Sequence, residues 1–464
     1  MRADRLFLER DGQPVAPTIA GLAREGAYFE RAYGQSGWTM PALASILTGR
    51  YPPVMSLREG YALSWLSDDQ NTLADILGLY GYHSAVFWGL TVPHGFPELA
   101  KGFDLVSSLE EPTQTKQPFR EAPIVWLDQA PEEPWFALVH NMDLHHPDPP
   151  PPPTVADRWE PAEPNSPVAS LDPRYTALKE SHDEQTARRE TIGAYDGALS
   201  FYDDELAAIL AAAKGASRER DLVIVLTSNH GQDLWDHGFL GHGSRHYESV
   251  LRVPLVWVDP KGPQGGMPIA GPAQGIDLAP TLLARAGITP DHTMHGQSLL
   301  PWLGMAEGQI EPRPIFSFSN PRGLSVIRGS HKLAAFSEET ADISSSPGLN
   351  TPPPRPSPHL YDLEADPAET TNLAASQPAI TSELQALLRT WTRAQRTGDA
   401  EQATAPTDEA FRRTLQQRGY WEHVATQPDP SEQPSEQPNK QPSEQPSEQP
   451  SEQPNKQPSE QPPR

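Results

Sequence analysis

The amino-acid sequence predicts an α/β fold with a smaller C-terminal α+β subdomain and a tail, and three observations carry this prediction. Up to about residue 310, apolar runs of strand length alternate with segments whose apolar residues recur at helical spacing. After about Glu311 the pattern changes to short strands followed by one helix. The last 39 residues are repetitive. We therefore expect an α/β domain at 1–310, a subdomain at 311–425 and a disordered tail at 426–464.

Hydrophobic periodicity places the elements of the first domain. The run Asp-Leu-Val-Ile-Val-Leu-Thr is apolar and β-branched, as in a central parallel strand, and it indicates a mostly parallel sheet. The expected strands are 83–88, 135–140 and 221–227, and the expected helices are 17–26, 72–80, 194–214 and 276–286. In the subdomain we expect strands at 323–329 and 332–336 and a helix at 379–396.

The chain contains 53 prolines, and they mark its irregular parts. From 431 to 462 the sequence is eight tetrapeptides, Ser-Glu-Gln-Pro or Asn-Lys-Gln-Pro, without any aromatic or aliphatic residue. Such a segment cannot bury enough apolar surface to offset the entropy of ordering, so we predict disorder. The proline clusters at 147–153 and 347–358 are expected to be surface loops.

Composition excludes several classes of protein. The absence of Cys excludes disulfides, thiolate zinc sites and a cysteine nucleophile. The net charge of −25 disfavours binding to nucleic acid or to an anionic membrane, and no apolar run approaches the ~20 residues that span a bilayer. The first residues lack the apolar stretch of a signal peptide. The localisation therefore stays open: cytoplasmic as written, periplasmic or secreted if the true start lies upstream.

Thr39 is the first candidate site residue. It stands just before a predicted helix that has Pro41 at its start and good helix formers from Ala42 to Leu47. Its hydroxyl would face the positive end of the helix dipole, where an anion is stabilised. The alternative is that Thr39 is only the N-cap, the commonest role of Thr at this place.

Histidines follow two of the predicted strands. His145 lies in the segment Val-His-Asn-Met-Asp-Leu-His-His-Pro, and Asn229 and His230 follow the strand at 221–227, with His242 a little further on. An amide oxygen and an imidazole can bind a metal, and ligands of α/β proteins gather at the carboxyl ends of strands. The alternatives are solvated loop histidines and an ordinary turn.

Seven segments together resemble the sulfatase family of the alkaline-phosphatase superfamily, over residues 2 to about 396. In chain order they are GWTMPALASILTGR, KGFD, WFALVHNMDLHHP, VIVLTSNHGQ, GHGSRHYESVLRVPLVW, IDLAPTLLARAGI and HLYDLEADPAETTNL. The resemblance implies an α/β/α sandwich and a hydrolase of sulfate or phosphate esters. It also implies a divalent cation, Ca²⁺ by family and Mn²⁺ or Zn²⁺ as alternatives, and a small-molecule or glycan ester as substrate.

The resemblance also assigns roles to individual residues. Thr39 stands where sulfatases have the Cys or Ser that becomes formylglycine, and it would act as an unmodified nucleophile. Asn229 and His230 would hold the metal, while His145 and His242 would contact the ester oxygens and protonate the leaving group. The family's first strand and its Asp ligands would lie upstream of Met1.

Departures from the family pattern leave two other functions open. Asn229 and Gln232 replace acidic residues of the family, and Ala42 and Leu43 stand in place of its Ser-Arg pair. A catalytically inactive relative that binds an anionic ligand would tolerate these changes. A Thr-dependent phosphodiesterase or phosphoryl transferase would use Thr39 unmodified.

Overall fold

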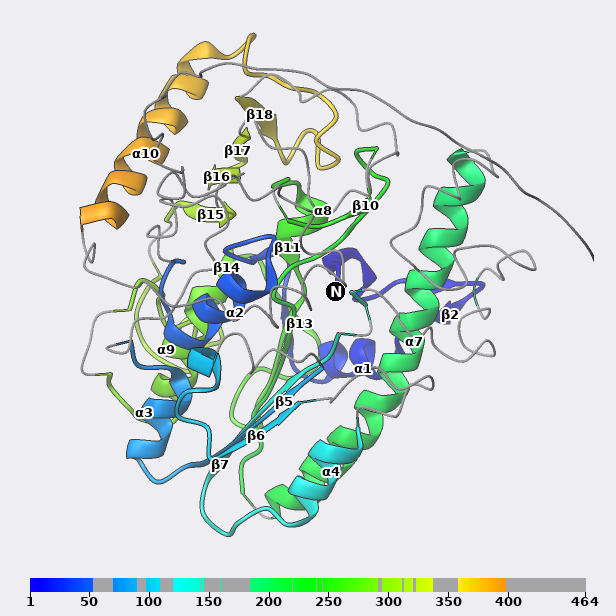
Figure 1. Ribbon diagram of the computed structural model, residues 1–464, viewed down its shortest axis with the longest axis vertical. Coiled ribbons are helices and arrows are strands. Elements are labelled where there is room, and N and C mark those ends of the chain that lie inside the picture. The colour runs from blue at the N-terminus through cyan, green and yellow to red at the C-terminus, as the bar shows by residue number, and fades with distance from the viewer. Residues whose placement is uncertain are drawn as a thin grey trace, which may run out of the picture. The chain divides into compact units, whose positions relative to one another are not determined.

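Figure 1 shows the computed structural model of the chain, which divides into two units, Met1–Glu422 and His423–Arg464. All the residues that the structure describes belong to the first unit. They are 1–52, 70–89, 97–108, 120–142, 144–145, 159, 184–218, 220–238, 240–243, 245–290, 294–310, 313–319, 323–336 and 358–397. The predicted tail and the proline cluster at 147–153 lie outside them, as does nearly all of the second cluster.

One sheet of the α/β part is parallel and three-stranded. β5 (His83–Trp88) pairs with β6 (Leu105–Ser108) on one side and with β7 (Trp135–His140) on the other. In register, Ala85 lies opposite Leu105 and Ala137. The strands predicted at 83–88 and 135–140 are therefore confirmed.

A second, four-stranded sheet is mixed, in the order β13-β3-β12-β8. β12 (Leu255–Val258) runs antiparallel to both β3 (Ala27–Phe29) and β8 (Ile224–Thr227), whereas β13 (Met267–Ile269) is parallel to β3. The expectation of a mostly parallel sheet is wrong here, because a run such as that of β8 signals burial and not the direction of its neighbour. Among the described residues β8 pairs with β12 alone.

Helices cover both faces of the sheet and make the sandwich of three layers (Figure 1). On β12, Val256 and Val258 pack with α1 (Pro17–Glu25) and α7 (Glu184–Ser217), and the alternate residues Leu255 and Trp257 face α9 (Leu278–Arg285). This alternation is the period of two of a strand buried on both faces. The remaining helices are α2 (Thr39–Thr48), α3 (Leu73–Leu79), α4 (Glu121–Asp128) and α8 (Glu248–Leu251).

An antiparallel sheet with one covering helix follows the α/β part. Its order is β15 (Ile315–Ser319), β16 (Gly323–Arg328), β17 (His331–Phe336) and β18 (His359–Asp362), with α10 (Pro378–Thr397) packed on it through Leu384, Leu388 and Trp391. The predicted strands and helix of this region are confirmed, and the domain boundary at 310 stays a prediction. None of the helices in the described part of the chain is long and apolar enough to span a membrane.

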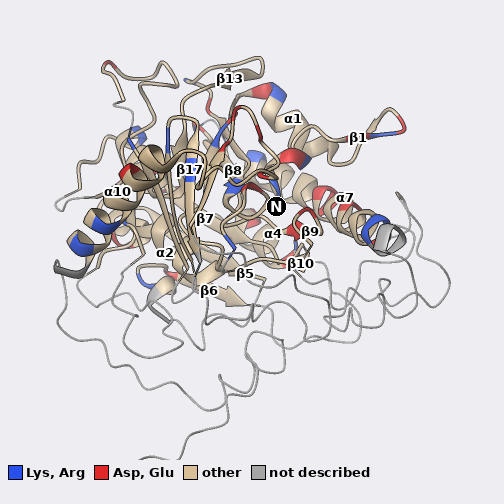
Figure 2. Cartoon of the chain, turned by 90° about the horizontal axis from the view of Figure 1, so that it is seen from above, with Lys and Arg blue, Asp and Glu red and all other residues tan. Residues whose placement is uncertain are grey.

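Short elements complete the described fold and position the segments around the site. They are η1 (Ala3–Arg5), β1 (Glu9–Arg10), β2 (Gln13–Pro14), β4 (Ala32–Tyr33), η4 (Pro97–Ala100), β9 (Asp233–Leu234), β10 (Leu240–Gly241), β11 (Arg252–Val253), β14 (Ala273–Gln274) and η6 (Gly275–Asp277). Figure 2, seen from above, shows acidic residues coloured along α7 and basic residues coloured on α10.

Candidate active site

The structure brings Thr39 against His230. Helix α2 begins at Thr39 itself, and Trp38 occupies the cap position without a side-chain hydrogen bond, so the alternative that Thr39 is the N-cap is wrong. The buried Thr39 hydroxyl Oγ1 lies 3.2 Å from Nε2 of His230. A hydroxyl at the start of a helix therefore meets an imidazole that follows strand β8.

The hydrogen bonds of His230 fix the role of each ring nitrogen. Nδ1 lies 2.8 Å from the carbonyl oxygen of Gly231, so it must carry the proton and donate it. Nε2 then has a free lone pair and accepts the hydroxyl hydrogen of Thr39. Burial, followed by the charge of His242, holds the pKa of His230 well below its usual value. The ring is therefore neutral at pH 7 and can take up a proton from the hydroxyl.

His242 and His145 form a second pair beside the first. Nε2 of His242 lies 2.8 Å from Nε2 of His145, and Nδ1 of His242 lies 3.0 Å from the carbonyl oxygen of Gly37. The ring of His242 also stacks on that of His230, with centroids 4.2 Å apart. One proton lies between the two Nε2 atoms, so the pair can pass a proton to a neighbouring oxygen.

Glycine at position 37 is required for this approach. A Cβ on Gly37 would lie 2.2 Å from the carbonyl oxygen of Gly243, a distance that no side chain tolerates. The tight backbone contact places the Gly37 carbonyl next to the ring of His242. It also places Trp38 beside that ring, with the two ring centroids 5.9 Å apart.

Asn229 adjoins the cluster but turns its oxygen away. Its Oδ1 accepts a hydrogen bond from the backbone N–H of His230 at 3.0 Å. Its Nδ2 is buried and has no hydrogen-bond partner among the described residues. The side chain therefore offers a donor, which suits an anion better than a cation.

The described residues do not fit a hard divalent cation such as Ca²⁺. Such a cation prefers several oxygen ligands, with carboxylates among them. The cluster instead offers imidazoles and an amide N–H, and the described residues hold no group of three or more His, Asp or Glu side chains that could bind a metal. The predicted ligands Asn229 and His230 are adjacent in space, but they do not make a metal site by themselves.

Two groups at the site were not among the predicted site residues. His140, the last residue of β7, has a buried Nδ1 without a hydrogen-bond partner in the described part of the chain. Burial lowers its pKa to about 4, with a smaller contribution from the charge at the N-terminal nitrogen of Met1.

That nitrogen is the second group. It donates to Ser228 Oγ at 2.5 Å and to the His230 carbonyl at 3.3 Å. His140 was visible in the histidine-rich segment, but no sequence signal could place Met1. Asp143 and His146 of that segment lie outside the described residues.

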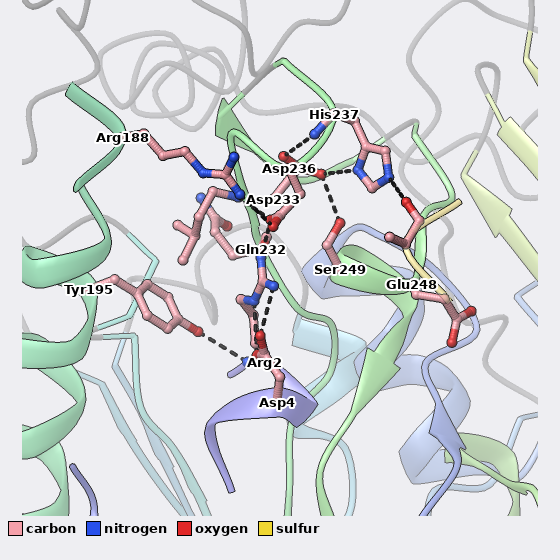
Figure 3. A network of polar contacts seen from close by, with 12 residues as sticks. Arg2, Asp4, Arg188, Tyr195, Gln232, Asp233, Asp236, His237, Glu248 and Ser249 are labelled. Carbon is pink, nitrogen blue, oxygen red and sulfur yellow. Dashed lines mark hydrogen bonds and ion pairs between the residues drawn. The ribbon is translucent and has the colours of Figure 1, made fainter. Parts of the chain in front are cut away.

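A polar network fixes the chain start against the segment that follows His230 (Figure 3). The Arg2 guanidinium donates to the Gln232 carbonyl at 3.1 Å and pairs with Asp4 and Asp236, and the Arg2 backbone N–H donates to the Tyr195 hydroxyl at 3.1 Å. Although burial opposes it, the pairing with Asp4 and then Asp236 raises the pKa of Arg2 above its usual value.

The same network continues around Asp233. Its carboxylate accepts from Ser249 Oγ at 2.8 Å and lies 2.7 Å from Nδ1 of His237, whose Nε2 lies 3.1 Å from the Ala368 carbonyl (Figure 3). Both nitrogens of His237 are thus engaged in holding the loop, and the ring does not face the Thr39 cluster.

The comparisons with known proteins identify the family. The family described as Sulfatase matches residues 1–288, more than half of the chain. Arylsulfatase K of Gallus gallus is 25% identical over 427 residues, covering 80% of this chain and 77% of the relative. Arylsulfatase K of Danio rerio is 29% identical over 188 residues, but the match spans only 34% of that relative and 40% of this chain.

Solved structures support the fold. BT4656 in complex with its substrate D-glucosamine-2-N,6-O-disulfate has a TM-score of 0.63 at 17% identity and covers 86% of this chain and 97% of its own. The phosphonate monoester hydrolase of Agrobacterium radiobacter has a TM-score of 0.58 at 22% identity, and the match covers 81% of this chain and 91% of that structure's chain. The chain belongs to the sulfatase family of the alkaline-phosphatase superfamily, a family of sulfuric ester hydrolases.

Proposed function

We propose that the protein hydrolyses sulfate esters, with Thr39 as the nucleophile and His230 as the base that activates it. The observation that carries the proposal is the 3.2 Å contact between Thr39 Oγ1 and His230 Nε2, with the proton of His230 held on Nδ1. A threonine hydroxyl is a weak nucleophile, and a neighbouring base that removes its proton is one of the ways in which enzymes activate it.

The first step transfers the sulfuryl group to the protein. The Thr39 oxygen attacks the ester sulfur while its proton passes to His230. The bond between the sulfur and the leaving oxygen breaks, and the protonated His145–His242 pair gives that oxygen its proton. The products are an alcohol and a sulfated Thr39, with His230 protonated and the pair neutral.

The second step releases sulfate. Water attacks the sulfur and gives a proton to the His145–His242 pair, and His230 returns its proton to the departing Thr39 oxygen. This step restores the Thr39 hydroxyl, the neutral His230 and the protonated His145–His242 pair. The N-terminus of α2 and the Asn229 Nδ2 donor stabilise the negative oxygens in both steps.

The substrate class is a small-molecule or glycan sulfate ester. The bound substrate of BT4656 is a sulfated sugar, and the matched relatives are named arylsulfatases. A phosphate or phosphonate ester is the second candidate, because the Agrobacterium radiobacter neighbour is named a phosphonate monoester hydrolase and Thr39 needs no modification to attack phosphorus.

A divalent cation is part of the proposal only if the site gains a carboxylate ligand. A cation such as Ca²⁺ would stabilise charge on the ester oxygens, but a carboxylate must first join Asn229 and His230. Asn229→Asp supplies one beside the cluster. We expect this variant to bind Ca²⁺ or Mn²⁺ more tightly than the parent chain by isothermal titration calorimetry, and an unchanged affinity would remove these two residues as metal ligands.

The test of the nucleophile is an assay of aryl sulfate and aryl phosphate hydrolysis with three variants. Thr39→Val has nearly the same shape without the hydroxyl and should lose activity by about a thousandfold or more, whereas Thr39→Ser should retain part of it. Thr48→Val is the control, because the Thr48 hydroxyl donates at 2.7 Å to Ala44 at the other end of α2, far along the helix from His230.

The outcomes separate the proposal from its rivals. Full activity in Thr39→Val would refute the nucleophile. If the parent chain binds sulfate but hydrolyses neither ester, the inactive anion-binding relative is the better description. If only aryl phosphate is cleaved, the protein is a Thr-dependent phosphoesterase.

A further inference from the structure

We propose that His246 and Ser319 are positioning residues of the active site. They hold the segment of residues 36–38, which leads into Thr39, from the side of the C-terminal subdomain. The proposal rests on the function proposed for Thr39. Neither side chain is hydrogen-bonded to Thr39 or to His230 in the described part of the chain, so both act through the backbone that lies between them and the site.

Strand β15 of the subdomain sheet is hydrogen-bonded to the segment that precedes Thr39. β15 is the first strand in the order β15-β16-β17-β18 (Figure 1). The backbone N–H of Phe318 donates to the carbonyl oxygen of Gln35 at 2.8 Å. The hydroxyl oxygen of the next residue, Ser319, accepts from the backbone N–H of Gly37 at 3.1 Å. The end of β15 therefore holds a run of backbone that stops two positions before Thr39.

His246 joins the Ser319 hydroxyl to the next strand of the subdomain sheet. Nε2 of its ring lies 2.9 Å from Ser319 Oγ, and Nδ1 lies 2.9 Å from Ser325 Oγ on β16. All three side chains are buried. Burial, followed by the charge of Lys332, lowers the pKa of His246 to about 3, so its ring is neutral at pH 7 and one nitrogen donates while the other accepts. The ring cannot turn without leaving a buried polar atom unpaired, and this fixes the Ser319 hydroxyl.

Gly37 connects this network to His242. Its N–H is bonded to Ser319, and its carbonyl oxygen lies 3.0 Å from Nδ1 of His242. Since a carbonyl oxygen only accepts, Nδ1 of His242 carries a proton and donates it, which turns Nε2 towards His145. The orientation of the His242 ring thus depends on the place of the Gly37 carbonyl, and Ser319 fixes that place through the N–H of the same residue.

Ser36 extends the network to the residue before Thr39. Its hydroxyl oxygen lies 3.1 Å from Ser319 Oγ and accepts from the backbone N–H of Trp38 at 3.1 Å. Both serines are 0% exposed, so no solvent is at hand to replace a lost partner. A shift of Trp38 would move the start of α2 and change the 3.2 Å contact between Thr39 and His230. A displacement of reacting groups by about 1 Å can lower a rate by about a hundredfold.

The experiment compares Ser319→Ala with Ser325→Ala in the full chain. Each change removes one buried hydroxyl that contacts a ring nitrogen of His246, but only the Ser319 hydroxyl also reaches Gly37. The two variants are therefore matched in what they cost the fold. Hydrolysis of aryl sulfate and aryl phosphate gives kcat and KM. The NMR shifts of the ring nitrogens of His242 report on its hydrogen bonds without any substrate, and urea denaturation measures stability.

We expect Ser319→Ala to lower kcat by about tenfold to a hundredfold with KM within about twofold, and Ser325→Ala to keep kcat within about twofold. The ring-nitrogen shifts of His242 should change in Ser319→Ala and stay in place in Ser325→Ala. If Ser319→Ala does not fold, His246→Gln and His246→Asn replace the pair. The longer Gln side chain carries its amide to the place of Nε2 and should keep more activity than Asn, whose amide reaches only the place of Nδ1.

The outcomes separate this proposal from the reaction proposed for Thr39. An equal fall of kcat in Ser319→Ala and Ser325→Ala overturns the positioning role, because the network then supports only the fold. So does an unchanged kcat in Ser319→Ala, or equal activity of the two His246 variants. If the parent chain hydrolyses neither ester, the reaction proposed for Thr39 fails, and the His242 shifts decide the positioning role alone. A change confined to Ser319→Ala then supports it, and the absence of that change refutes it.

Discussion

β5 and β7 are adjacent strands of equal length in one parallel sheet, yet their side chains meet different surroundings. Both have six residues, and both sequences, HSAVFW and WFALVH, are largely apolar. Among the described residues, β5 is paired on both edges and buries all but its first residue, whereas β7 is paired on one edge and buries none fully. The burial of a strand is thus decided by its neighbours, and a sequence pattern cannot report which neighbours are present.

The largest expected effect is on the free energy of unfolding, when one phenylalanine of β5 and one of β7 are each replaced by alanine. Phe87 of β5 is 1% exposed, and Phe136 of β7 is half-buried. Phe87→Ala should lower the free energy of unfolding by about 3–5 kcal/mol, the usual cost of emptying a core site, and Phe136→Ala by only about 1–2 kcal/mol. Urea denaturation of the two variants measures the difference. Equal losses would mean that β7 is as well covered as β5.

The next effect concerns pH, and it comes from the ends of β7 and β8. The Met1 amine has a pKa of about 5 in the fold against an ordinary value of 8.0. Between these values the unfolded chain binds a proton that the folded chain does not. Stability should therefore be full above pH 8 and fall as the pH decreases towards 5, by up to roughly 4 kcal/mol from this group. His140, with a pKa of about 4, adds a further fall below pH 6.5.

The matched control for the pH effect is the same chain acetylated at its N-terminus, in which the Met1 nitrogen is an amide. Urea denaturation at pH 5, 6.5 and 8 should show a smaller fall in this chain, while the part due to His140 remains. His246, buried between Ser319 and Ser325 at the subdomain sheet, has a pKa lowered to about 3 and contributes equally to both chains. A pH dependence that is identical in the two chains would contradict the assignment to Met1.

The sequence predicts local structure well and spatial relations poorly. The bounds of β5 and β7 were read correctly from apolar runs, and the seven family segments led to the right fold. The antiparallel pairing of β8 with β12 was missed, since a β-branched run looks the same in either direction. Thr39 and His230 were both singled out as site candidates. Their contact joins residues 191 positions apart, and the tautomer of His230 depends on the Gly231 carbonyl. Geometry of that kind is set by packing and leaves no pattern in the sequence.

The smallest expected effect on stability comes from replacing either of two arginines that contact the loop before β7. Arg220 donates to the carbonyl oxygens of Glu132 and Glu133 and so links the starts of β7 and β8, whereas Arg218 makes an exposed ion pair with the Glu132 carboxylate at 3.6 Å and no other polar side-chain contact among the described residues. Hydrogen bonds from a charged donor contribute about 1–3 kcal/mol, and an exposed ion pair contributes about 0–1 kcal/mol. Arg220→Ala should therefore lower the free energy of unfolding by about 1–3 kcal/mol and speed amide exchange at the starts of both strands. Arg218→Ala should do neither. If Arg220→Ala speeds exchange in β8 alone, the guanidinium does not hold the starts of the two strands together.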